Sequence, residues 1–574
     1  MRTRVVTLLL IAILVTGAGL MLGAMRQESA TVDETSYLGA GYCFFQTGSY
    51  RFAVGHPILS QLLPSFPLRF FRIHESPEMA SLLQGKVLMP YSCRWSGPVG
   101  STKELFPNGP DFYHWPPPES QYFGQYLVYD PANDAEGLLF WGRFTQVILT
   151  VALGLLVFFW ARKLAGPQAG LIATTAWMAN PVVLGYGHLI LTDMSITLML
   201  AVTVWLYAEF LQKPSTLRAV LVGVAVGLSF VMKFTALSLL PILGVITVMY
   251  WWRVKRTESA RATAPWVKQL AIRLAMMVVA AWAVVMIVYF PNWSPAPPIT
   301  PERAQALGVP GWFQALRPIL LPRDYFKELA VMVGHVREGG DSYLMGQWSR
   351  TGWWYYYILA ISFKSPIPLL LMFLGGLVLL LRKWPRQSFG ELVPWLAAAA
   401  YLCFSMTSKV NIGLRHALPV YSMLAVAVGT QLAKTRQRWK IGVWVLCGWL
   451  SLTALFAYPF YIPYFNELVG GPKNGYKYLI DSNFDWGQDA KRLKQFLDER
   501  GIQRIYLDYF GTQAAIPYYQ IPATRVNGEQ ARQIQQGDLV VSASQLVRPE
   551  WDWLRQSRQP KDCIAYTMFL YQFP

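Results

Sequence analysis

Long apolar stretches alternate with short polar segments along this chain. Five of them, at 7–25, 146–160, 234–252, 274–290 and 443–460, approach the ~20 residues that an α-helix needs to cross ~30 Å of hydrocarbon. The whole pattern predicts about eleven membrane-spanning helices, at roughly 5–25, 138–160, 168–186, 194–211, 217–232, 234–252, 268–290, 353–382, 391–408, 417–433 and 441–460. We therefore expect an all-α polytopic membrane protein.

Basic residues mark the ends of these stretches and set the expected topology. The net charge is +18, but it is divided among many short segments, so we expect no nucleic-acid partner. The basic clusters fall at alternate ends of the apolar stretches, as the positive-inside rule requires of cytoplasmic loops. They contain Arg2, Arg4, Arg162, Lys163, Lys213, Arg218, Arg253, Lys255, Arg256, Arg382, Lys383, Arg386, Lys434 and Lys440. An odd number of spans then gives a cytoplasmic N-terminus and an external C-terminal segment.

Two parts follow from this topology. Residues 1–460 form the membrane module, with an uncleaved first span as anchor and two large external loops at about 26–137 and 291–352. Residues 461–574 have the composition of a soluble domain, and we expect a small external α/β fold there. Its predicted elements are a helix over 487–500 with Asp485 as N-cap and strands at 504–509 and 537–542.

Proline interrupts the apolar stretch 353–382 at Lys364-Ser365-Pro366. Because proline removes a backbone donor and clashes with the preceding turn, this helix must break or kink. In hydrocarbon such a break is tolerated only against protein or a water-filled cavity, so Lys364 is expected in a cavity wall.

The cysteines and the search for nucleotide-binding motifs give limited information about function. Cys43 and Cys93 share the first loop, where a disulfide is an option that the sequence does not settle. There is no Walker loop and no dinucleotide fingerprint, so we expect no nucleotide cofactor and an energy source that lies in the substrate.

Carboxylates at span ends are the first candidates for chemistry. Asp33 and Glu34 follow the first span, and Asp193 opens the fourth span on the same side, with His188 just before it. A general base for a hydroxyl or amine acceptor needs such a carboxylate. A divalent cation held by Asp33, Asp193 and His188 is a further option, because carboxylates suit hard cations. The alternative for Asp33 and Glu34 is that they are solvated loop residues.

Cations on the external side are the second group of candidates. Lys233, Lys364 and Arg415 with His416 fall where the positive-inside rule predicts few positive charges. Together they are typical of a phosphate site, since Arg binds oxygens bidentately and Lys acts as a point charge. Each alone could instead extend to the lipid headgroups.

The order of these motifs resembles the family 39 glycosyltransferases of the GT-C fold, which include protein O-mannosyltransferases and lipid A aminoarabinose transferases. The resemblance rests on Asp33-Glu34, Gly55-His56-Pro57, Thr192-Asp193 and Lys233-Phe234-Thr235-Ala236. Three further segments, at 364–366, 415–419 and 464–489, are similar to a bacterial branch of phospholipid carrier-dependent glycosyltransferases.

This resemblance implies an inverting transfer of a hexosyl or pentosyl group from a polyprenyl-phosphate sugar, with Asp33 as base. Glu34 and Asp193 would orient substrate or metal, and His56, Lys233 and Arg415 would receive the phosphate or line the cavity. The acceptor would be a lipid, a glycan or a protein. The expected location is the bacterial inner (plasma) membrane, with the C-terminal domain in the periplasm.

Two rival interpretations belong to other classes. A transporter or flippase of lipid-linked sugars would also span the membrane many times and carry intramembrane cations, but such proteins often show internal symmetry, which this sequence lacks. A scaffold for envelope assembly would not need Asp33.

Overall fold

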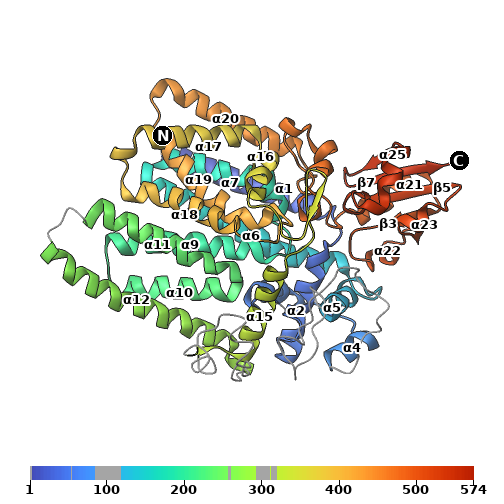
Figure 1. Cartoon of the computed structure of the whole chain (residues 1–574), viewed down its shortest axis with the longest axis horizontal. Coiled ribbons are helices and arrows are strands. Elements are labelled where there is room, and N and C mark those ends of the chain that lie inside the picture. The colour runs from blue at the N-terminus through green and yellow to red at the C-terminus, as the bar shows by residue number, and fades with distance from the viewer. Residues whose placement is uncertain (1–2, 54, 85–117, 256–259, 293–310, 312–319) are drawn as a thin grey trace.

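The computed structural model of the chain describes residues 3–53, 55–84, 118–255, 260–292, 311 and 320–574. A bundle of long, roughly parallel helices occupies one end of the molecule, and a small sheet occupies the other (Figure 1). The N-terminus lies at the far end of the bundle and the C-terminus at the far end of the sheet. The predicted class, a polytopic helical membrane protein with a small α/β region at its C-terminal end, is confirmed.

Seven helical segments in the described part of the chain are long and apolar enough to cross a membrane. They are Thr3–Met25, Ala135–Ala165, Thr192–Gln212, Phe234–Arg253, Gln269–Tyr289, Leu414–Ala433 and Gln437–Phe456. Three shorter apolar helices, Thr216–Met232, Ile367–Arg382 and Phe389–Ser405, lie among them. The count of eleven spans stays a prediction.

The predicted span at 168–186 divides into two short helices. The first, α7, covers Pro167–Met178, and the second, α8, covers Pro181–Tyr186. Pro181 cannot continue the preceding helix, and the Asn180 side chain caps the new one by accepting a hydrogen bond from Val182 N at 3.1 Å. The hydrophobic pattern alone does not show this break, because both halves are apolar, and the available signal was Asn180-Pro181.

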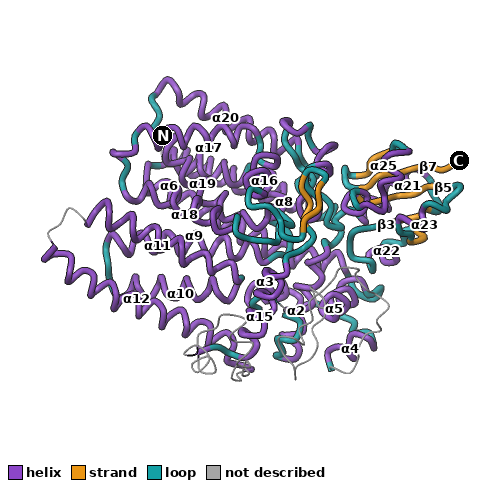
Figure 2. The backbone as a smooth tube through the Cα atoms, in the orientation of Figure 1, coloured by secondary structure: helices purple, strands orange, loops and turns teal. Residues whose placement is uncertain are grey.

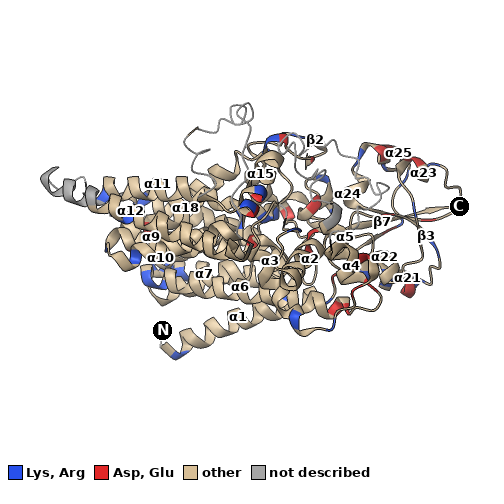
Figure 3. Cartoon of the chain, turned by 90° about the horizontal axis from the view of Figure 1, so that it is seen from below, with Lys and Arg blue, Asp and Glu red and all other residues tan. Residues whose placement is uncertain are grey.

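The helices of the bundle have the following bounds: α1 Thr3–Met25, α6 Ala135–Ala165, α9 Thr192–Gln212, α10 Thr216–Met232, η3 Phe234–Ser238, α11 Leu239–Tyr250, η4 Trp251–Lys255, α12 Ala260–Tyr289, η5 Phe290–Asn292, α16 Tyr356–Lys364, α17 Ile367–Arg382, η6 Trp384–Arg386, α18 Phe389–Ser405, η7 Leu414–Ala417, α19 Leu418–Ala433 and α20 Gln437–Phe456. Helix α19 packs against α7, α18 and α6, so it lies at the centre of the bundle. Basic residues gather at the bundle end remote from the sheet (Figure 3).

The predicted break at Ser365-Pro366 is confirmed. Helix α16 ends at Lys364 and α17 begins at Ile367. The Asn466 side chain donates to the carbonyl oxygens of Ser362 and Ser365, at 2.6 and 2.8 Å. Backbone oxygens that the break leaves without helical donors are therefore satisfied by protein, as a membrane-embedded break requires.

Short helices cover the bundle end that faces the sheet. They are α2 Val32–Thr47, α3 Leu59–Ser65, η1 Phe66–Phe70, α4 Pro77–Leu83, α5 Pro118–Tyr129 and α15 Arg323–Glu338, and a hairpin of β1 Ser342–Leu344 and β2 Gln347–Ser349 follows. Helices α2 and α5 pack closely because Gly124 brings its backbone against Thr35; a Cβ at Gly124 would collide with the Thr35 carbonyl. This packing fixes the helix whose first turn carries Asp33.

A five-stranded sheet with strand order β4-β3-β5-β7-β6 forms the C-terminal end of the molecule (Figure 2). Strand β3 pairs in parallel with β4 and β5, and β7 pairs antiparallel with β5 and β6. The elements after α20 are η8 Glu467–Val469, η9 Pro472–Lys477, η10 Asp481–Asn483, α21 Ala490–Arg500, β3 Ile505–Asp508, α22 Ala515–Tyr518, β4 Ala523–Arg525, α23 Gly528–Ala531, β5 Gly537–Ser542, α24 Ala543–Leu546, η11 Pro549–Trp551, α25 Asp552–Ser557, β6 Asp562–Ile564 and β7 Met568–Phe573.

The two strands predicted in this region are confirmed as β3 and β5, but the predicted N-cap of the helix is wrong. Helix α21 starts at Ala490, and Asp485 instead accepts a hydrogen bond from Ser544 N at 2.9 Å. Asp485 therefore connects the segment before the helix to α24, which directly follows β5. The division into parts at residue 460 stays a prediction.

Candidate active site

Asp33 lies in the first turn of α2, with its carboxylate in the wall of a cavity. Arg415 Nη1 lies 2.9 Å from Asp33 Oδ2, and the Tyr37 hydroxyl lies 3.5 Å from the same oxygen. The side chain of Asp33 keeps 21% of its surface exposed. It is thus both oriented by a cation and open to the cavity.

Glu34, the next residue, points away from the cavity. Arg143 forms a bidentate pair with its carboxylate, Nε to Oε1 at 2.8 Å and Nη2 to Oε2 at 2.7 Å, and both side chains are fully buried. The backbone N–H groups of Thr31 and Ile190 also donate to it, at 2.9 and 3.0 Å. Burial alone would raise the pKa of Glu34, but Arg143 and these donors hold it below its ordinary value. Glu34 therefore has structural contacts in the protein interior and does not line the cavity.

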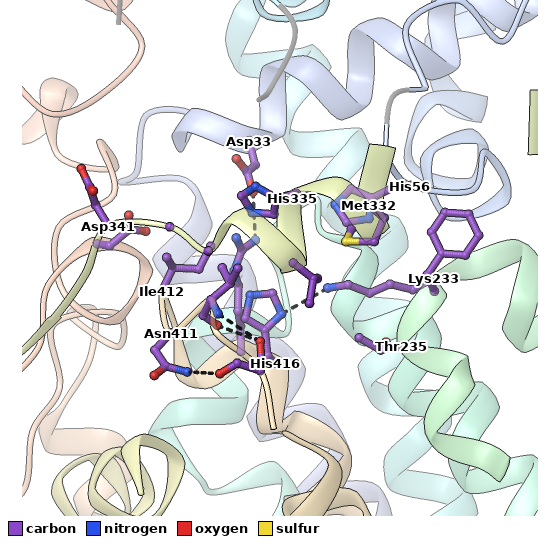
Figure 4. Close-up of a pocket in the computed structure, with 18 of the residues that line it drawn as sticks. Asp33, His56, Lys233, Thr235, Met332, His335, Asp341, Asn411, Ile412 and His416 are labelled. Carbon is purple, nitrogen blue, oxygen red and sulfur yellow. Dashed lines mark hydrogen bonds and ion pairs between the residues drawn. The ribbon is translucent and has the colours of Figure 1, made fainter. Parts of the chain in front are cut away.

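A second charged group forms around Asp193, in the first turn of α9. Lys233 Nζ donates to Asp193 Oδ1 at 2.6 Å, and His416 Nδ1 lies 3.5 Å from the same oxygen. Arg415 Nη1 approaches the other oxygen to 3.8 Å, so Arg415 stands between Asp33 and Asp193. Figure 4 shows Lys233 and His416 pointing toward each other across this group.

These residues line a cavity of about 630 Å³ that is built from segments far apart in the sequence. Lys233 follows α10, and Arg415 and His416 lie in η7, just before α19. Each sits where a helix begins or ends, so the charged groups meet at one end of the bundle. Candidate residues that line the cavity are Asp33, His56, Lys233, Arg415 and His416, while Asp193 reaches it through Lys233 and His416.

His56 packs on the cavity side of α2. Its ring meets the Tyr37 ring edge-on, with 5.7 Å between the ring centroids. Burial, and after it the charge of Lys233, hold the pKa of His56 well below its ordinary value. A neutral imidazole in this wall can line or hydrogen-bond a substrate, but it adds no positive charge for a phosphate.

Besides Glu34 and Asp193, two further candidates, His188 and Lys364, do not line the cavity. His188 is fully buried, with Nε2 at 2.8 Å from Glu28 Oε2 and Nδ1 at 2.8 Å from Leu184 O. Lys364 donates to the carbonyl oxygens of Ile462, at 2.7 Å, and Asn483. The expectation that Lys364 lines a cavity is therefore not met; the lysine ties the broken helix to the segment before the sheet.

The residues present do not fit the divalent cation that the sequence left open. Among the described residues, no three His, Cys, Asp or Glu side chains are grouped to hold a metal ion. His188 is engaged with Glu28, and the carboxylates of Asp33 and Asp193 face cationic partners, which a second cation would have to displace.

The segment before α21, which the sequence identified only as part of the similar region 464–489, contributes residues to the cavity. Trp486 lies under Arg415, with 4.2 Å from the guanidinium carbon to the ring centroid. Asp481 lines the cavity with φ 58°, a conformation that few residues other than glycine adopt. Burial raises the pKa of Asp481 to about 6, against the lowering effect of Arg415. A dense run of Asp, Ser, Asn and Trp after the last apolar stretch was the available signal.

This segment also holds the two partners of the Asp33–Arg415 pair in position. Val32 N donates to Trp486 O at 3.1 Å, just before Asp33. Leu414 N, just before Arg415, donates to Asn483 Oδ1 at 2.8 Å. The geometry of the carboxylate and the guanidinium therefore depends on a segment more than fifty residues beyond η7.

A family model described as dolichyl-phosphate-mannose-protein mannosyltransferase matches residues 137–284. This part of the chain contains Asp193 and Lys233 but not Asp33 or Arg415. A search of curated proteins found no match to the chain.

Several solved structures are similar along most of their length. ArnT from Cupriavidus metallidurans bound to undecaprenyl phosphate is 13% identical over 99% of this chain and 98% of its own, with a TM-score of 0.43. The S. cerevisiae protein O-mannosyltransferase Pmt1-Pmt2 complex bound to the sugar donor is 12% identical over 79% and 89%, with a TM-score of 0.46. The oligosaccharyltransferase AglB from Archaeoglobus fulgidus, with an inhibitory peptide and a dolichol-phosphate, is 12% identical over 93% and 69%, with a TM-score of 0.43.

The match of the family model therefore confirms, for residues 137–284, the predicted resemblance to protein mannosyltransferases.

Proposed function

We propose that this protein is an inverting glycosyltransferase that moves a hexosyl or pentosyl group from a polyprenyl-phosphate donor to an acceptor. The observation that carries the proposal is the Asp33–Arg415 pair in the wall of a large cavity, beside Lys233 and His416. A carboxylate next to several cations is what transfer from a phosphate ester needs, since a proton must leave the acceptor and negative charge must be neutralised on the phosphate. The family description, which names a sugar on a lipid phosphate, supports the donor class.

The reaction follows from the position of these groups. Asp33 accepts the proton of the acceptor hydroxyl, whose oxygen forms a bond to the anomeric carbon. The bond from that carbon to the phosphate oxygen breaks, and the phosphate leaves with the electron pair, on the side opposite to the attack. Arg415 and Lys233 stabilise the charge that develops on the leaving phosphate, and His416 lies beside them in the cavity wall.

The contacts of Arg415 also suggest a reason why Asp33 becomes available as a base when the donor binds. In the free protein its guanidinium is shared between Asp33 and Asp193. A bound phosphate competes for the same donors, and a guanidinium prefers a bidentate oxyanion. Binding of the donor therefore weakens the contact with Asp33 and leaves that carboxylate free to take a proton.

The orientation and the location belong to the same proposal. Basic residues gather at the bundle end remote from the sheet, which the positive-inside rule assigns to the cytoplasm (Figure 3). The cavity and the C-terminal region then face outward, in a bacterial plasma membrane with the sheet in the periplasm. The acceptor is a lipid, a glycan or a protein on that side.

Replacing Arg415 with Lys tests the donor site. The charge that Asp33 and Asp193 require is retained, but the fork that binds two phosphate oxygens is lost. We expect kcat/KM for the lipid donor to fall by about 10- to 100-fold, since hydrogen bonds to charged groups contribute about 1.5–3 kcal/mol. Initial rates of label transfer from lipid-linked sugar, at varied donor concentration, measure this.

The matched control is Arg500→Lys, because Arg500 pairs with Asp562 at 3.0 Å on the surface of the C-terminal region. It should leave the kinetics unchanged. Equal donor kinetics for Arg415→Lys and the wild type would contradict a donor phosphate at this position.

A further inference from the structure

The C-terminal region supplies one wall of the cavity, and the reaction proposed above gives this wall no task. Phe510, Ser544 and Arg548 come from that region, and they face the cavity together with Trp348 of the β1–β2 hairpin. Among them, Arg548 is the one that carries a positive charge.

Arg548 differs from Arg415 in its carboxylate contacts: its charge helps to lower the pKa of Asp481 in the same cavity, but it forms no direct ion pair with a described carboxylate. Among the described residues it makes no ion pair within 4.0 Å, and its buried Nε has no hydrogen-bond partner. Its guanidinium lies over the Trp348 indole, with 5.4 Å from the central carbon to the ring centroid. By contrast, Arg415 contacts both Asp33 and Asp193.

The Trp348 indole, on which Arg548 stacks, is held in place by two contacts. Trp348 Nε1 donates to Val547 O at 3.4 Å, and the Tyr343 ring meets the indole edge-on at 5.3 Å. Stacking on an aromatic face holds a guanidinium in place while its N–H groups stay available in the plane. The arrangement is thus a preformed receptor for an oxyanion, which can accept two parallel hydrogen bonds from such a fork.

The position of Arg548 separates it from the donor phosphate. Lys233, Arg415 and His416 lie beside helices of the membrane bundle, where the phosphate of a lipid must stay. Arg548 follows α24 in the C-terminal region, beyond the last span. A ligand that contacts Arg548 therefore enters the cavity from outside the membrane bundle. In the proposed reaction that ligand is the acceptor.

We propose that Arg548 and Trp348 form an anion-binding position that holds a phosphate or carboxylate group of the acceptor while the acceptor hydroxyl reaches Asp33. The identification of the ligand as the acceptor rests on the proposed function, whereas the anion-binding position itself does not. It gives the C-terminal region a task, the selection of acceptors that carry a negative charge.

Phosphate binding by the full chain in lipid nanodiscs tests the proposal. Undecaprenyl phosphate is added first to fill the donor position, and inorganic phosphate is then titrated and followed by calorimetry. We expect Arg548→Gln to weaken the binding of inorganic phosphate at least about tenfold and Arg548→Lys to weaken it less, because the lysine keeps the charge. The affinity for undecaprenyl phosphate should be the same in all proteins.

Arg532→Gln is the matched control, because Arg532 also lies over an indole of the C-terminal region, Trp553, at 6.0 Å, but does not line the cavity. Unchanged phosphate binding in Arg548→Gln would overturn the proposal. A loss of undecaprenyl phosphate affinity in Arg548→Gln would overturn it too, since Arg548 would then serve the donor. If the wild type failed to bind undecaprenyl phosphate, the proposed function would fail, whereas phosphate binding that depends on Arg548 would still support the oxyanion position.

Discussion

Replacing Asp33 with Asn is expected to lower sugar transfer by about 10²- to 10⁴-fold, the usual contribution of a positioned general base. The amide has nearly the shape of the carboxylate but cannot take the proton of the acceptor hydroxyl. The buried Arg415 keeps acceptors in this variant, because the amide oxygen can still accept its hydrogen bond and Asp193 lies 3.8 Å from the same nitrogen. Transfer of labelled sugar from lipid extract, in membranes with matched amounts of protein, measures the effect.

Asp498→Asn is the control for Asp33→Asn. Asp498 is an exposed carboxylate that pairs with Lys494 at 2.5 Å in α21, away from the cavity. It should transfer sugar like the wild type, and Asp33→Asn should still bind the lipid donor. Full transfer by Asp33→Asn would remove this residue from the chemistry.

Replacing Glu34 with Gln is expected to destabilise the protein by about 3–5 kcal/mol, the usual cost of breaking a buried ion pair from one side. Arg143 would remain buried, with backbone oxygens of Met25, Glu28 and Ser29 as acceptors but without its carboxylate. Thermal unfolding of the purified protein and its yield from membranes measure the effect. The neighbouring substitution at Asp33 should leave both nearly unchanged.

Two further variants separate a structural role of Glu34 from a catalytic one. Arg143→Met in the Glu34→Gln background should restore part of the lost stability, because the unpaired charge is gone. Glu78→Gln, in the first turn of α4 on the surface, should change little. A Glu34→Gln protein that is as stable as the wild type but inactive would show that Glu34 acts in the reaction.

The contrast between Asp33 and Glu34 shows what the sequence could not provide. Both are acidic, adjacent and just past the first span, so the pattern predicts the same role for both. In a helix, consecutive side chains point about 100° apart, and the packing of α2 turns one toward the cavity and the other toward Arg143. One signal was present: an arginine within the predicted span 138–160 requires a buried partner.

The long apolar helices and the break after Lys364 could be predicted because hydrophobic length and proline act locally. The cavity depends on packing between distant segments, which local patterns do not contain. Charge at span ends still identified Asp33, Asp193, Lys233 and Arg415, and the structure brings these side chains together. Their roles remain proposals. Trp486 and Asn483 were not identified, because their effect on Arg415 requires the chain to return to the bundle after the last span.

The most direct test measures whether the lipid-linked donor is cleaved or is only moved across the membrane. The purified protein is placed in liposomes with polyprenyl-phosphate sugar that is labelled in the sugar, and a membrane extract supplies the acceptor. A glycosyltransferase must release one polyprenyl phosphate for each sugar that reaches the acceptor, and this release must be lost in Asp33→Asn. An intact donor whose labelled sugar moves from one leaflet to the other would contradict the account, because the protein would then be a flippase.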